Sequence, residues 1–541
     1  MRIGVDVGGT NTDAVLMNGA DVVAWTKSPT TPDVNAGVAA AIKEILDKAG
    51  VEPGAIRSVM VGTTHFTNAL VERRGLDRVG IIRLASPSGE ALPPMTGWPT
   101  ELVASIGSNI FMLPGGYEFD GREIAPLDES KVRDAARTLR AAGIAAIAIV
   151  SAFAPVNSSM ELRAAAVVSE EYPQSMVTVS SAIGRVGLIE RENAAILNAA
   201  LSTLAARIVA SFGAALEALG ITAPLYISQN DGTLLSSAQA AAYPVMTIGS
   251  GPTNSMRGAA FLTGRSDAIV MDVGGTTTDI GVLANGFPRE SSIAVDIGGV
   301  RTNFRMPDTL AIGLGGGTRI HLGAEFYGSD VAMADRLRVG PDSVGYRILE
   351  DAYLFGGATL TASDVAVAAG QADFGDHRAA LPPLSPLVLT TITARFRSIL
   401  EEGIDRMKTS RDDATILAVG GGNFLIPDGL KGVAEVIRPA HAGVANAVGA
   451  AIAQVGGQME QVFDYDVTPR DEALAAMRVE VGRRVVEAGG DAATVQVVEV
   501  DEVYLSYLPG HAAQVRMKAV GDLLQDNIVA LFSKSGVVHA H

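Results

Sequence analysis

One short pattern occurs twice in this chain and limits what the chain can fold into. The first copy is Ile3-Gly-Val-Asp-Val-Gly-Gly-Thr-Asn-Thr-Asp13, and the second is Ile269-Val-Met-Asp-Val-Gly-Gly-Thr-Thr-Thr-Asp279. Each apolar run breaks at Gly-Gly-Thr, where small residues allow a tight turn whose backbone N–H groups can approach an anion. Asn-Gly follows the next apolar run in both copies, a strong signal for a two-residue hairpin turn. Each copy therefore predicts a strand, an anion-binding turn, a second strand, a hairpin turn and a third strand.

Composition narrows the class of protein and of ligand. A chain of 541 residues is too long for one ordinary core, and its many glycines and few aromatic residues are typical of an α/β protein. The net charge of −17 without a basic run argues against nucleic-acid and membrane partners, because both need clustered Lys and Arg. The absence of cysteine excludes disulfides, thiolate metal sites and iron–sulfur clusters. We expect a cytoplasmic protein without a leader that binds a small molecule.

Two apolar segments resemble membrane spans only at first sight. Residues 141–154 are short for a span, and residues 440–459 are interrupted by polar residues and glycines. We interpret the first as a buried strand with its approach turn, and the second as a helix packed closely on other backbone.

Several further segments carry polar or glycine-rich turns. Gly62-Thr-Thr-His65 follows a predicted strand, and we interpret His65 as a capping or packing residue rather than a catalytic one. Charged residues precede a predicted long helix that ends at Leu219, and either a solvated first turn or a substrate-facing role suits them: Arg185, Glu190, Arg191 and Glu192. Residues 86–121 are predicted to be an irregular insertion and residues 245–248 a strand. His539 and His541 favour a frayed end over a metal site.

The two copies together predict a nucleoside triphosphate site. The charge of a triphosphate exceeds what one turn can neutralise, so two opposed turns would supply N–H and hydroxyl donors while aspartates hold Mg²⁺ through water. A decayed repeat that serves only as sheet is disfavoured, because a buried unpaired carboxylate is costly. Asp6 and Asp272 are the candidate catalytic and Mg²⁺-binding residues. We favour a structural role for Asp13 and leave that of Asp279 open.

This arrangement resembles the superfamily of sugar kinases, heat-shock chaperone ATPases and actin, and within it the hydantoinase A and 5-oxoprolinase family. The resemblance rests on the two hairpins and on an ordered series of segments: Gly62 to Leu70, Asn193 to Leu201, Ser228 to Gly232, Ser250 to Pro252, Gly313 to Ile320 and Gly420 to Asn423. It implies a two-lobed, actin-like (ribonuclease H-like) α/β fold with a small α/β segment appended at the carboxyl terminus. The implied domains are a first lobe at 1–180, a second lobe at 181–440, a crossing helix at 441–460 and a cap at 461–541.

The resemblance also implies which residues contact ATP. The phosphate and adenosine contacts would come from Gly8, Gly9, Thr10, Asn11, Thr12, Gly274, Gly275, Thr276, Thr277, Gly315, Gly316, Gly420, Gly421, Gly422 and Asn423. The sequence departs from the family at Arg338 to Arg347, which lacks the usual Pro-Gly-Pro-Ala-Cys-Tyr stretch. That departure concerns the substrate pocket rather than the nucleotide site.

The leading functional hypothesis is ATP-dependent opening of a cyclic amide such as a hydantoin or 5-oxoproline. Family members commonly work with a second subunit, of hydantoinase B type or otherwise, so we expect a homo- or hetero-oligomer. A small-molecule kinase is the main alternative, because the same machinery serves sugar kinases. An ATP-gated regulatory protein is the third, because chaperones and actin share the fold.

Overall fold

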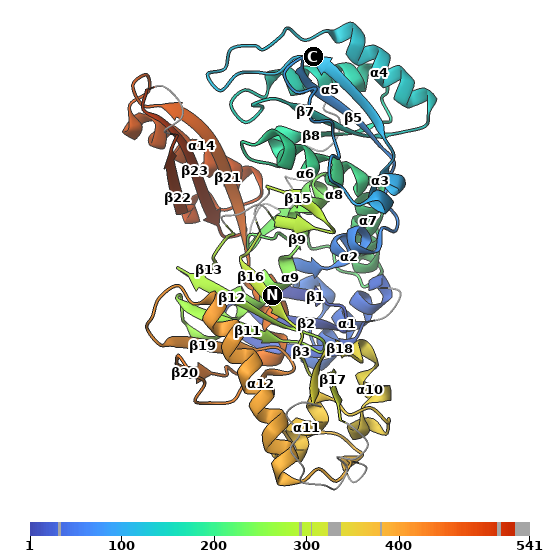
Figure 1. The fold of residues 1–541 in the computed structure, drawn as a ribbon, viewed down its shortest axis with the longest axis vertical. Coiled ribbons are helices and arrows are strands. Elements are labelled where there is room, and N and C mark those ends of the chain that lie inside the picture. Colours follow the sequence, from blue (N-terminus) through green and yellow to red (C-terminus); the bar gives the residue numbers. More distant parts are fainter. Residues whose placement is uncertain are drawn as a thin grey trace.

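The computed structural model describes residues 1–30, 34–291, 295–303, 306–322, 337–378, 381–505 and 510–524. His539 and His541 lie outside the described residues. The chain forms two lobes with helices around their sheets (Figure 1), so the predicted two-lobed actin-like α/β fold is confirmed.

A nine-stranded sheet organises the first lobe. Its strands, in spatial order, are β22 (Gln496–Tyr504), β23 (Ala512–Gly521), β21 (Gln454–Asp464), β10 (Thr233–Ser236), β9 (Leu225–Ser228), β4 (Ser58–Thr63), β1 (Arg2–Val7), β2 (Asn11–Asn18) and β3 (Asp21–Pro29). β1, β4 and β9 are parallel, so their carboxyl ends meet at one edge of the sheet. In open α/β sheets this edge is where ligands bind.

A second sheet repeats the centre of the first. Its strands are β13 (Phe287–Pro288), β12 (Thr278–Ala284), β11 (Ala268–Val273), β19 (Ala414–Val419) and β20 (Val433–Ile437), with β16 (Thr309–Ile312) also paired to β12. Asp272 lies opposite Asp279 in the β11–β12 hairpin, as Asp6 lies opposite Asp13 in the β1–β2 hairpin. β19 runs parallel to β11 as β4 runs parallel to β1. The repeat in the sequence is thus a repeat in structure.

The two Asn-Gly dipeptides do not form identical turns. Ala284 pairs with Phe287, so Asn285 and Gly286 are the loop residues, and both have positive φ (52° and 78°), as a primed hairpin turn requires. In the first copy Asn18 pairs with Asp21, which moves the loop to Gly19 and Ala20. The register shifts between Leu16 and Met17, and this irregularity explains why the predicted turn lies one residue early.

A parallel four-stranded sheet lies at the far end of the first lobe. Its strands are β6 (Asn109–Pro114), β5 (Val79–Ser86), β7 (Ala146–Ser151) and β8 (Met176–Val179), and it packs with α4 (Glu129–Ala141) and α5 (Ser159–Glu171). The prediction of an irregular insertion at 86–121 is wrong in part, because this stretch contains β6 and α3 (Thr100–Ile106). Both are held by tertiary contacts: β6 pairs with β5, and α3 buries Leu102 and Ile106.

Other helices cover the two lobes. They are α1 (Val34–Ala49), α2 (His65–Glu72), α6 (Leu188–Ala200), α7 (Ser202–Ala218), α8 (Ser237–Ala242), α9 (Ser250–Thr263), α10 (Ile348–Asp351), α11 (Ala362–Ala368), α12 (Pro386–Met407), α13 (Ala445–Ile452) and α14 (Arg470–Glu487). The predicted helix through Leu219 is two helices, because the chain bends by 53° between α6 and α7. The predicted strand at 245–248 is also wrong: Pro244 begins a 3₁₀ turn over Pro244–Thr247.

The described part of the chain has no single helix long and apolar enough to cross a membrane. By length and composition alone, only the bent pair of α6 and α7 passes such a test.

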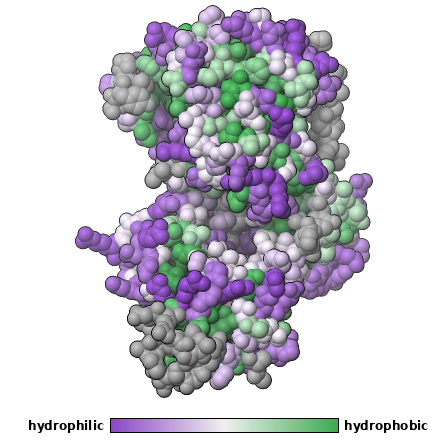
Figure 2. Space-filling model, turned by 45° about the vertical axis from the view of Figure 1, so that its right-hand side comes forward, coloured by the Kyte–Doolittle hydropathy of each residue, from purple (hydrophilic) through white to green (hydrophobic). Residues whose placement is uncertain are grey.

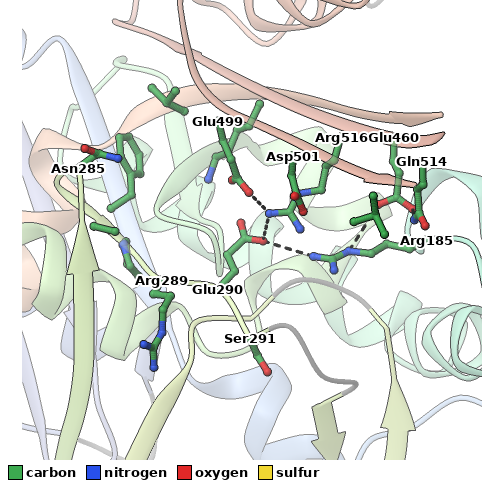
Figure 3. A pocket seen from close by; sticks show the side chains of 16 residues that line it. Arg185, Asn285, Arg289, Glu290, Ser291, Glu460, Glu499, Asp501, Gln514 and Arg516 are labelled. Carbon is green, nitrogen blue, oxygen red and sulfur yellow. Dashed lines mark hydrogen bonds and ion pairs between the residues drawn. The ribbon is translucent and has the colours of Figure 1, made fainter. Parts of the chain in front are cut away.

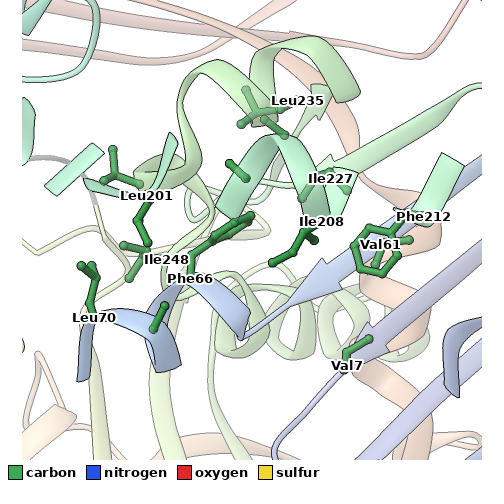
Figure 4. Packing of buried hydrophobic residues seen from close by; sticks show 14 of the residues in the cluster. Val7, Val61, Phe66, Leu70, Leu201, Ile208, Phe212, Ile227, Leu235 and Ile248 are labelled. Atoms are coloured by element: carbon green, nitrogen blue, oxygen red, sulfur yellow. The ribbon is translucent and has the colours of Figure 1, made fainter. Parts of the chain in front are cut away.

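The core of the first lobe fixes the ligand-binding edge of its sheet. Val7, Val61 and Ile227 come from near the ends of the three parallel strands and pack in one cluster with Phe66 of α2 and Phe212 of α7 (Figure 4). Fully burying one such side chain stabilises the fold by roughly 1.5–3 kcal/mol. The turns that follow β1, β4 and β9 therefore project from a rigid base.

The carboxyl-terminal segment is joined to the first lobe. β21 pairs with β10, and β23 and β22 extend the sheet beyond it, with α14 packed on β21 and β23. In Figure 1 this unit projects beside the junction of the lobes, and Figure 2 shows hydrophilic and hydrophobic residues interspersed over the surface of both lobes. The predicted boundary at residue 180 does not coincide with a change of sheet, since β9 and β10 belong to the same sheet as β1. The predicted domain limits remain predictions.

Candidate nucleotide site

The two hairpins line one cavity of about 310 Å³ between the lobes. Most of the predicted contact residues line it: Asp6, Gly8, Gly9, Thr10, Asn11, Asp272, Gly274, Gly275, Thr276, Thr277, Gly420 and Gly421. The two turns face each other closely, because a Cβ atom on Gly275 would lie 3.3 Å from Thr10 Oγ1. The arrangement is that of two opposed anion-binding turns.

Asp6 and Asp13 are buried in the first hairpin and well bonded. Asp6 accepts hydrogen bonds from Asn254 Nδ2 at 3.0 Å and Asn446 Nδ2 at 3.1 Å. Asp13 pairs with Lys27 Nζ at 2.7 Å and accepts a hydrogen bond from Asn446 Nδ2 at 2.8 Å. Asn446 thus joins the two carboxylates, and these contacts hold Asp13 as a structural anchor of the turn.

The second hairpin has fewer partners for its carboxylates. Asp272 accepts a hydrogen bond from Ser255 Oγ at 2.5 Å. Asp279 lies opposite Asp272, and both keep part of their surface open to the cavity. Like charges placed directly opposite each other repel, so this pair favours an incoming cation.

Burial raises the pKa values of these carboxyl groups. It raises the pKa of Asp6 to about 6, with the two asparagines acting in the opposite direction. Burial, and then repulsion from Asp272, raises the pKa of Asp279 to about 7. Burial also raises the pKa values of Asp13 and Asp272. Among the described cavity-lining residues Lys27 is the one cation beside these acids, so the site is suited to a bound cation.

A glycine stands beside each central aspartate. A Cβ atom on Gly62 would lie 2.2 Å from Asp6 Oδ1, and one on Gly420 would lie 2.2 Å from Asp272 Oδ1. Gly62 is the next-to-last residue of β4, and Gly420 directly follows β19; these strands are the parallel neighbours of β1 and β11. The neighbouring strand therefore needs glycine there to leave room for the carboxylate.

Five predicted contact residues do not line the cavity. Gly315 and Gly316 support the second turn from behind, since Gly316 N–H donates to Gly274 O at 2.9 Å and Gly317 N–H to Gly275 O at 2.7 Å. The Gly422 N–H bonds Val273 O, the Asn423 side chain bonds Gly420 O, and Thr12 is buried under the first turn.

Sequence reasoning missed four side chains of this site. Lys27, Ser255 and Asn446 line the cavity, and Asn254 lies behind Asp6. Thr64, from the polar turn predicted after β4, also lines the cavity. Asn254 and Ser255 lie on α9, which crosses α13 so closely that a Cβ atom on Gly449 would lie 1.8 Å from Asn254 O. A lone asparagine in each small-residue helix was the available signal, because a buried amide needs a polar partner.

Arg185 precedes α6, whereas Glu190, Arg191 and Glu192 lie in its first turns. Arg191 and Glu192 are buried, so neither predicted role fits these two residues. Arg191 is fully buried and donates to the carbonyls of Ser151 and Gly187. Glu192 forms a bidentate, fully buried ion pair with Arg83. Arg185 and Glu190 pair with Glu290 and Arg301, respectively.

His65 is half-buried at the first position of α2, directly after the turn that follows β4. Its Nδ1 contacts Thr63 Oγ1, and burial lowers its pKa. The neutral imidazole therefore belongs to the turn, in agreement with a packing role.

The described residues contain no group of three or more His, Asp or Glu side chains placed to hold a metal ion directly. Asp6 and Asp272 offer two carboxylates across the cavity, a donor set that suits Mg²⁺ retaining most of its water.

Comparison with known families agrees with this geometry. The sequence model of the hydantoinase/oxoprolinase N-terminal region matches residues 2–172, and that of the hydantoinase/oxoprolinase domain matches residues 191–377. The chain belongs to the hydantoinase/oxoprolinase family. The family predicted from the sequence motifs is therefore confirmed.

Two relatives of this hydantoinase/oxoprolinase chain are subunits of enzymes named for different reactions. It is 29% identical over 395 residues to the caprolactamase alpha subunit of Pseudomonas jessenii, a match that covers 68% of this chain and 54% of the relative. It is 27% identical over 528 residues to the acetophenone carboxylase gamma subunit of Aromatoleum aromaticum, covering 85% and 69%. The chain thus spans about half the length of the caprolactamase subunit.

Solved structures share the fold. The ATP-dependent caprolactamase from Pseudomonas jessenii superposes with a TM-score of 0.77 at 21% identity, covering 97% of this chain and 88% of that one. A nucleotide-free acetone carboxylase superposes with a TM-score of 0.67 at 20% identity, covering 96% and 88%.

Proposed function

We propose that this protein uses ATP to open a cyclic amide such as a hydantoin, a lactam or 5-oxoproline, as one subunit of a larger enzyme. The observation that carries the proposal is the pair of opposed Asp-x-Gly-Gly-Thr turns in one cavity of a hydantoinase/oxoprolinase chain. The caprolactamase relative supports the cyclic-amide class.

The chemistry explains why ATP is needed. Resonance makes an unstrained amide a poor electrophile and its nitrogen a poor leaving group. Transfer of the γ-phosphoryl group to the carbonyl oxygen releases ADP and leaves an activated imidate. Water then adds to the ring carbon, and the C–N bond breaks as the nitrogen takes a proton, which leaves an acyl phosphate. A second water hydrolyses the acyl phosphate to the ring-opened acid and free phosphate.

The residues of the cavity would divide this work. The turns at Gly8 to Thr10 and Gly274 to Thr276 would bind the phosphates through backbone N–H and hydroxyl donors. Lys27, which also donates to Gly443 O in the turn before α13 at 3.0 Å, would balance the phosphate charge. Asp6 and Asp272 would orient the reacting groups.

Mg²⁺ would be held by Asp6 and Asp272, largely through water, and would supply neutralisation of the triphosphate charge. The raised pKa of Asp6 supports this assignment, because a carboxylate buried without a full cation partner favours binding one.

A second subunit, of hydantoinase B type or otherwise, would complete hydrolysis. The relatives named as subunits support this expectation. We also propose a cytoplasmic location, where ATP is abundant.

ATP-dependent carboxylation of a ketone is a second candidate. The match to the acetophenone carboxylase gamma subunit favours it, since that match covers 85% of this chain. A ketone and a cyclic amide both present a carbonyl oxygen, so one nucleotide site can serve either reaction.

Phosphate release from Mg-ATP tests the proposal. We expect hydantoin, a lactam or 5-oxoproline to stimulate release, and sugars to have no effect. Stimulation by a sugar alone would identify a kinase, and stimulation by a ketone with bicarbonate alone would identify a carboxylase. No stimulation by any of them, with nucleotide still bound, would favour an ATP-gated regulatory protein.

A further inference from the structure

A second cavity is larger than the nucleotide cavity and has its own set of lining residues. Its volume is about 590 Å³, within the range that binds small molecules. It lies between the far end of the first lobe, at Val156 and Ile183, and the carboxyl-terminal segment, at Gln458. The turn after β9 contributes Gln229 and Asn230 to its lining.

Three polar side chains of this cavity make no hydrogen bond within the described structure, and the oxygen of one of them is fully buried. Asn230 is 3% exposed, and its side-chain amide has no hydrogen-bond partner among the described residues. Gln458 Oε1 is buried and likewise unpaired. The Tyr243 hydroxyl also lacks a partner within the described ranges, and burial raises its pKa, which keeps it a neutral donor. Leaving a buried acceptor such as Gln458 Oε1 unpaired costs about 1–3 kcal/mol, and the Asn230 amide and the Tyr243 hydroxyl offer further bonding positions to a ligand.

The charges of this cavity are paired within the protein. Arg185 lies 3.8 Å from Glu460, and Arg484 pairs with Glu480 at 2.8 Å and donates to Gln458 O. The remaining polar lining is uncharged, and apolar side chains such as Met246, Ile183 and Val156 complete it. A neutral ligand with one polar edge and one hydrocarbon edge suits this lining. A sugar would place hydroxyl groups against the apolar side.

The sheet joins this cavity to the nucleotide site. Asn230 follows β9, whose carboxyl end lies at the same edge as those of β4 and β1. The phosphate turn after β1 is thus two strands away, or roughly 10 Å at the usual strand spacing. Thr253 Oγ1 of α9 donates to Asn230 O at 2.8 Å, and Gly251 and Ser255 of the same helix line the nucleotide cavity.

Resting on the function proposed above, we propose that this cavity is the acceptor site and that it takes an uncharged cyclic amide or imide. The amide side chain of Asn230 and the hydroxyl of Tyr243 bond to the C=O and N–H edge of the ring. Met246 and Ile183 contact its hydrocarbon edge. Hydantoin and simple lactams are accepted over 5-oxoproline, whose carboxylate finds no uncommitted cation here.

The neighbouring cavity has the opposite character. It holds about 580 Å³ and is lined by four acidic and four basic side chains, among them Arg185, Glu290 and Arg516 (Figure 3). Glu290 pairs with Arg185 at 3.3 Å and Arg516 at 3.0 Å, which ties the second lobe to β23. Its charges join parts of the protein, so it is the less suitable site for a neutral ring.

Titration calorimetry on the full chain, with hydantoin, a lactam and 5-oxoproline as probes, tests the acceptor site. We expect Tyr243→Phe and Asn230→Ala each to weaken hydantoin binding about tenfold, which corresponds to about 1.4 kcal/mol for one lost hydrogen bond. ATP affinity should stay unchanged. Ala182→Trp, which fills the cavity from an exposed position, should abolish amide binding. Tyr504→Phe is the matched control, because Tyr504 is 60% exposed on β22.

The outcomes separate the site from the function. If amides stimulate phosphate release by the wild type but Tyr243→Phe and Ala182→Trp leave the amide concentration for half-maximal release unchanged, this site is wrong and the proposed function stands. If hydantoin binds and the variants weaken it, while no amide stimulates release, the site stands and the proposed function falls. Tighter binding of 5-oxoproline than of hydantoin would overturn the preference for an uncharged ring. Circular dichroism of each variant confirms that it is folded.

Discussion

Four aspartates face one lysine in the nucleotide cavity, and the two pairs are compensated unequally. Lys27 and Asn446 bind the first pair, whereas Ser255 is the one side-chain donor bonded to the second pair within the described structure. The second pair is therefore where a cation gains most from binding. Within this pair, Asp272 lies next to Gly420, whose missing side chain leaves space for the carboxylate just beyond the end of β19.

Replacing Asp272 with Asn tests this role. The substitution keeps the size and the Ser255 contact but removes the charge that would orient Mg²⁺. We expect amide-stimulated phosphate release to fall at least about 100-fold with the melting temperature preserved. Asp267→Asn, on the surface before β11, is the control. Full activity of the Asp272 variant would disprove the site assignment.

The raised pKa values predict a pH dependence of stability. An acid whose pKa is raised by folding stabilises the folded state below its unfolded pKa of 3.8, and this contribution is lost as the pH rises through the folded pKa. For Asp6 and Asp279 the loss extends to pH values of about 6 and 7. We expect the ligand-free protein to unfold at a lower temperature at pH 8 than at pH 5.

Asp279→Asn should remove part of the loss of stability between pH 5 and pH 8. It should stabilise the ligand-free protein at pH 8 by on the order of 1–3 kcal/mol. This is less than the full pKa shift would give, because Asp279 is open to the cavity and solvent screens its charge. Thermal unfolding from pH 5 to 8 measures the effect. A variant with the same pH profile as the wild type would show that Asp279 does not carry the raised pKa.

At the scale of elements, the crossing of α9 and α13 positions the site. Gly258 and Gly449 let the two backbones touch, and the same helices carry Asn254 and Asn446, the two donors to Asp6. The close approach of the helices thus sets the position of the Asp6 carboxylate.

Gly258→Ala tests the crossing. The new Cβ would lie 1.9 Å from Ala445 O, so the helices must separate. We expect a loss of about 3 kcal/mol or more in the free energy of unfolding, measured by urea denaturation, together with weaker nucleotide binding. Gly213→Ala in α7, where a Cβ meets no atom within 4 Å, should instead stabilise by about 0.5–1 kcal/mol. Equal stabilities of the two variants would contradict the close crossing.

At the scale of the whole molecule, the carboxyl-terminal segment touches both lobes. It continues the first lobe's sheet through β21, and Arg516 of β23 pairs with Glu290 of the second lobe. Its strands therefore belong to the junction between the lobes.

Glu290→Gln should loosen this junction without unfolding either lobe. Removing a largely buried charge that faces Arg185 and Arg516 should cost on the order of 2 kcal/mol, and amide hydrogen exchange in β23 should rise. Glu487→Gln, which breaks an exposed pair on α14, should change exchange little. Unchanged exchange in β23 of the Glu290 variant would show that the ion pairs do not hold the junction.

The sequence by itself determined the family, the two-lobed fold and the two turns of the nucleotide cavity. Each turn is set locally, because it needs only an apolar strand followed by Gly-Gly-Thr. The repeat of that pattern, with the ordered series of other motifs, indicates the family and its two lobes. Only the tertiary structure decided which distant side chains complete the site. Lys27, Asn254 and Asn446 reach the aspartates because strand register and helix crossing bring them there. The sequence could not show that Arg191 and Glu192 are buried, because a charged helix start has the same pattern whether it faces solvent or a core. Only the packing of β5 and β7 against α6 buries these two side chains.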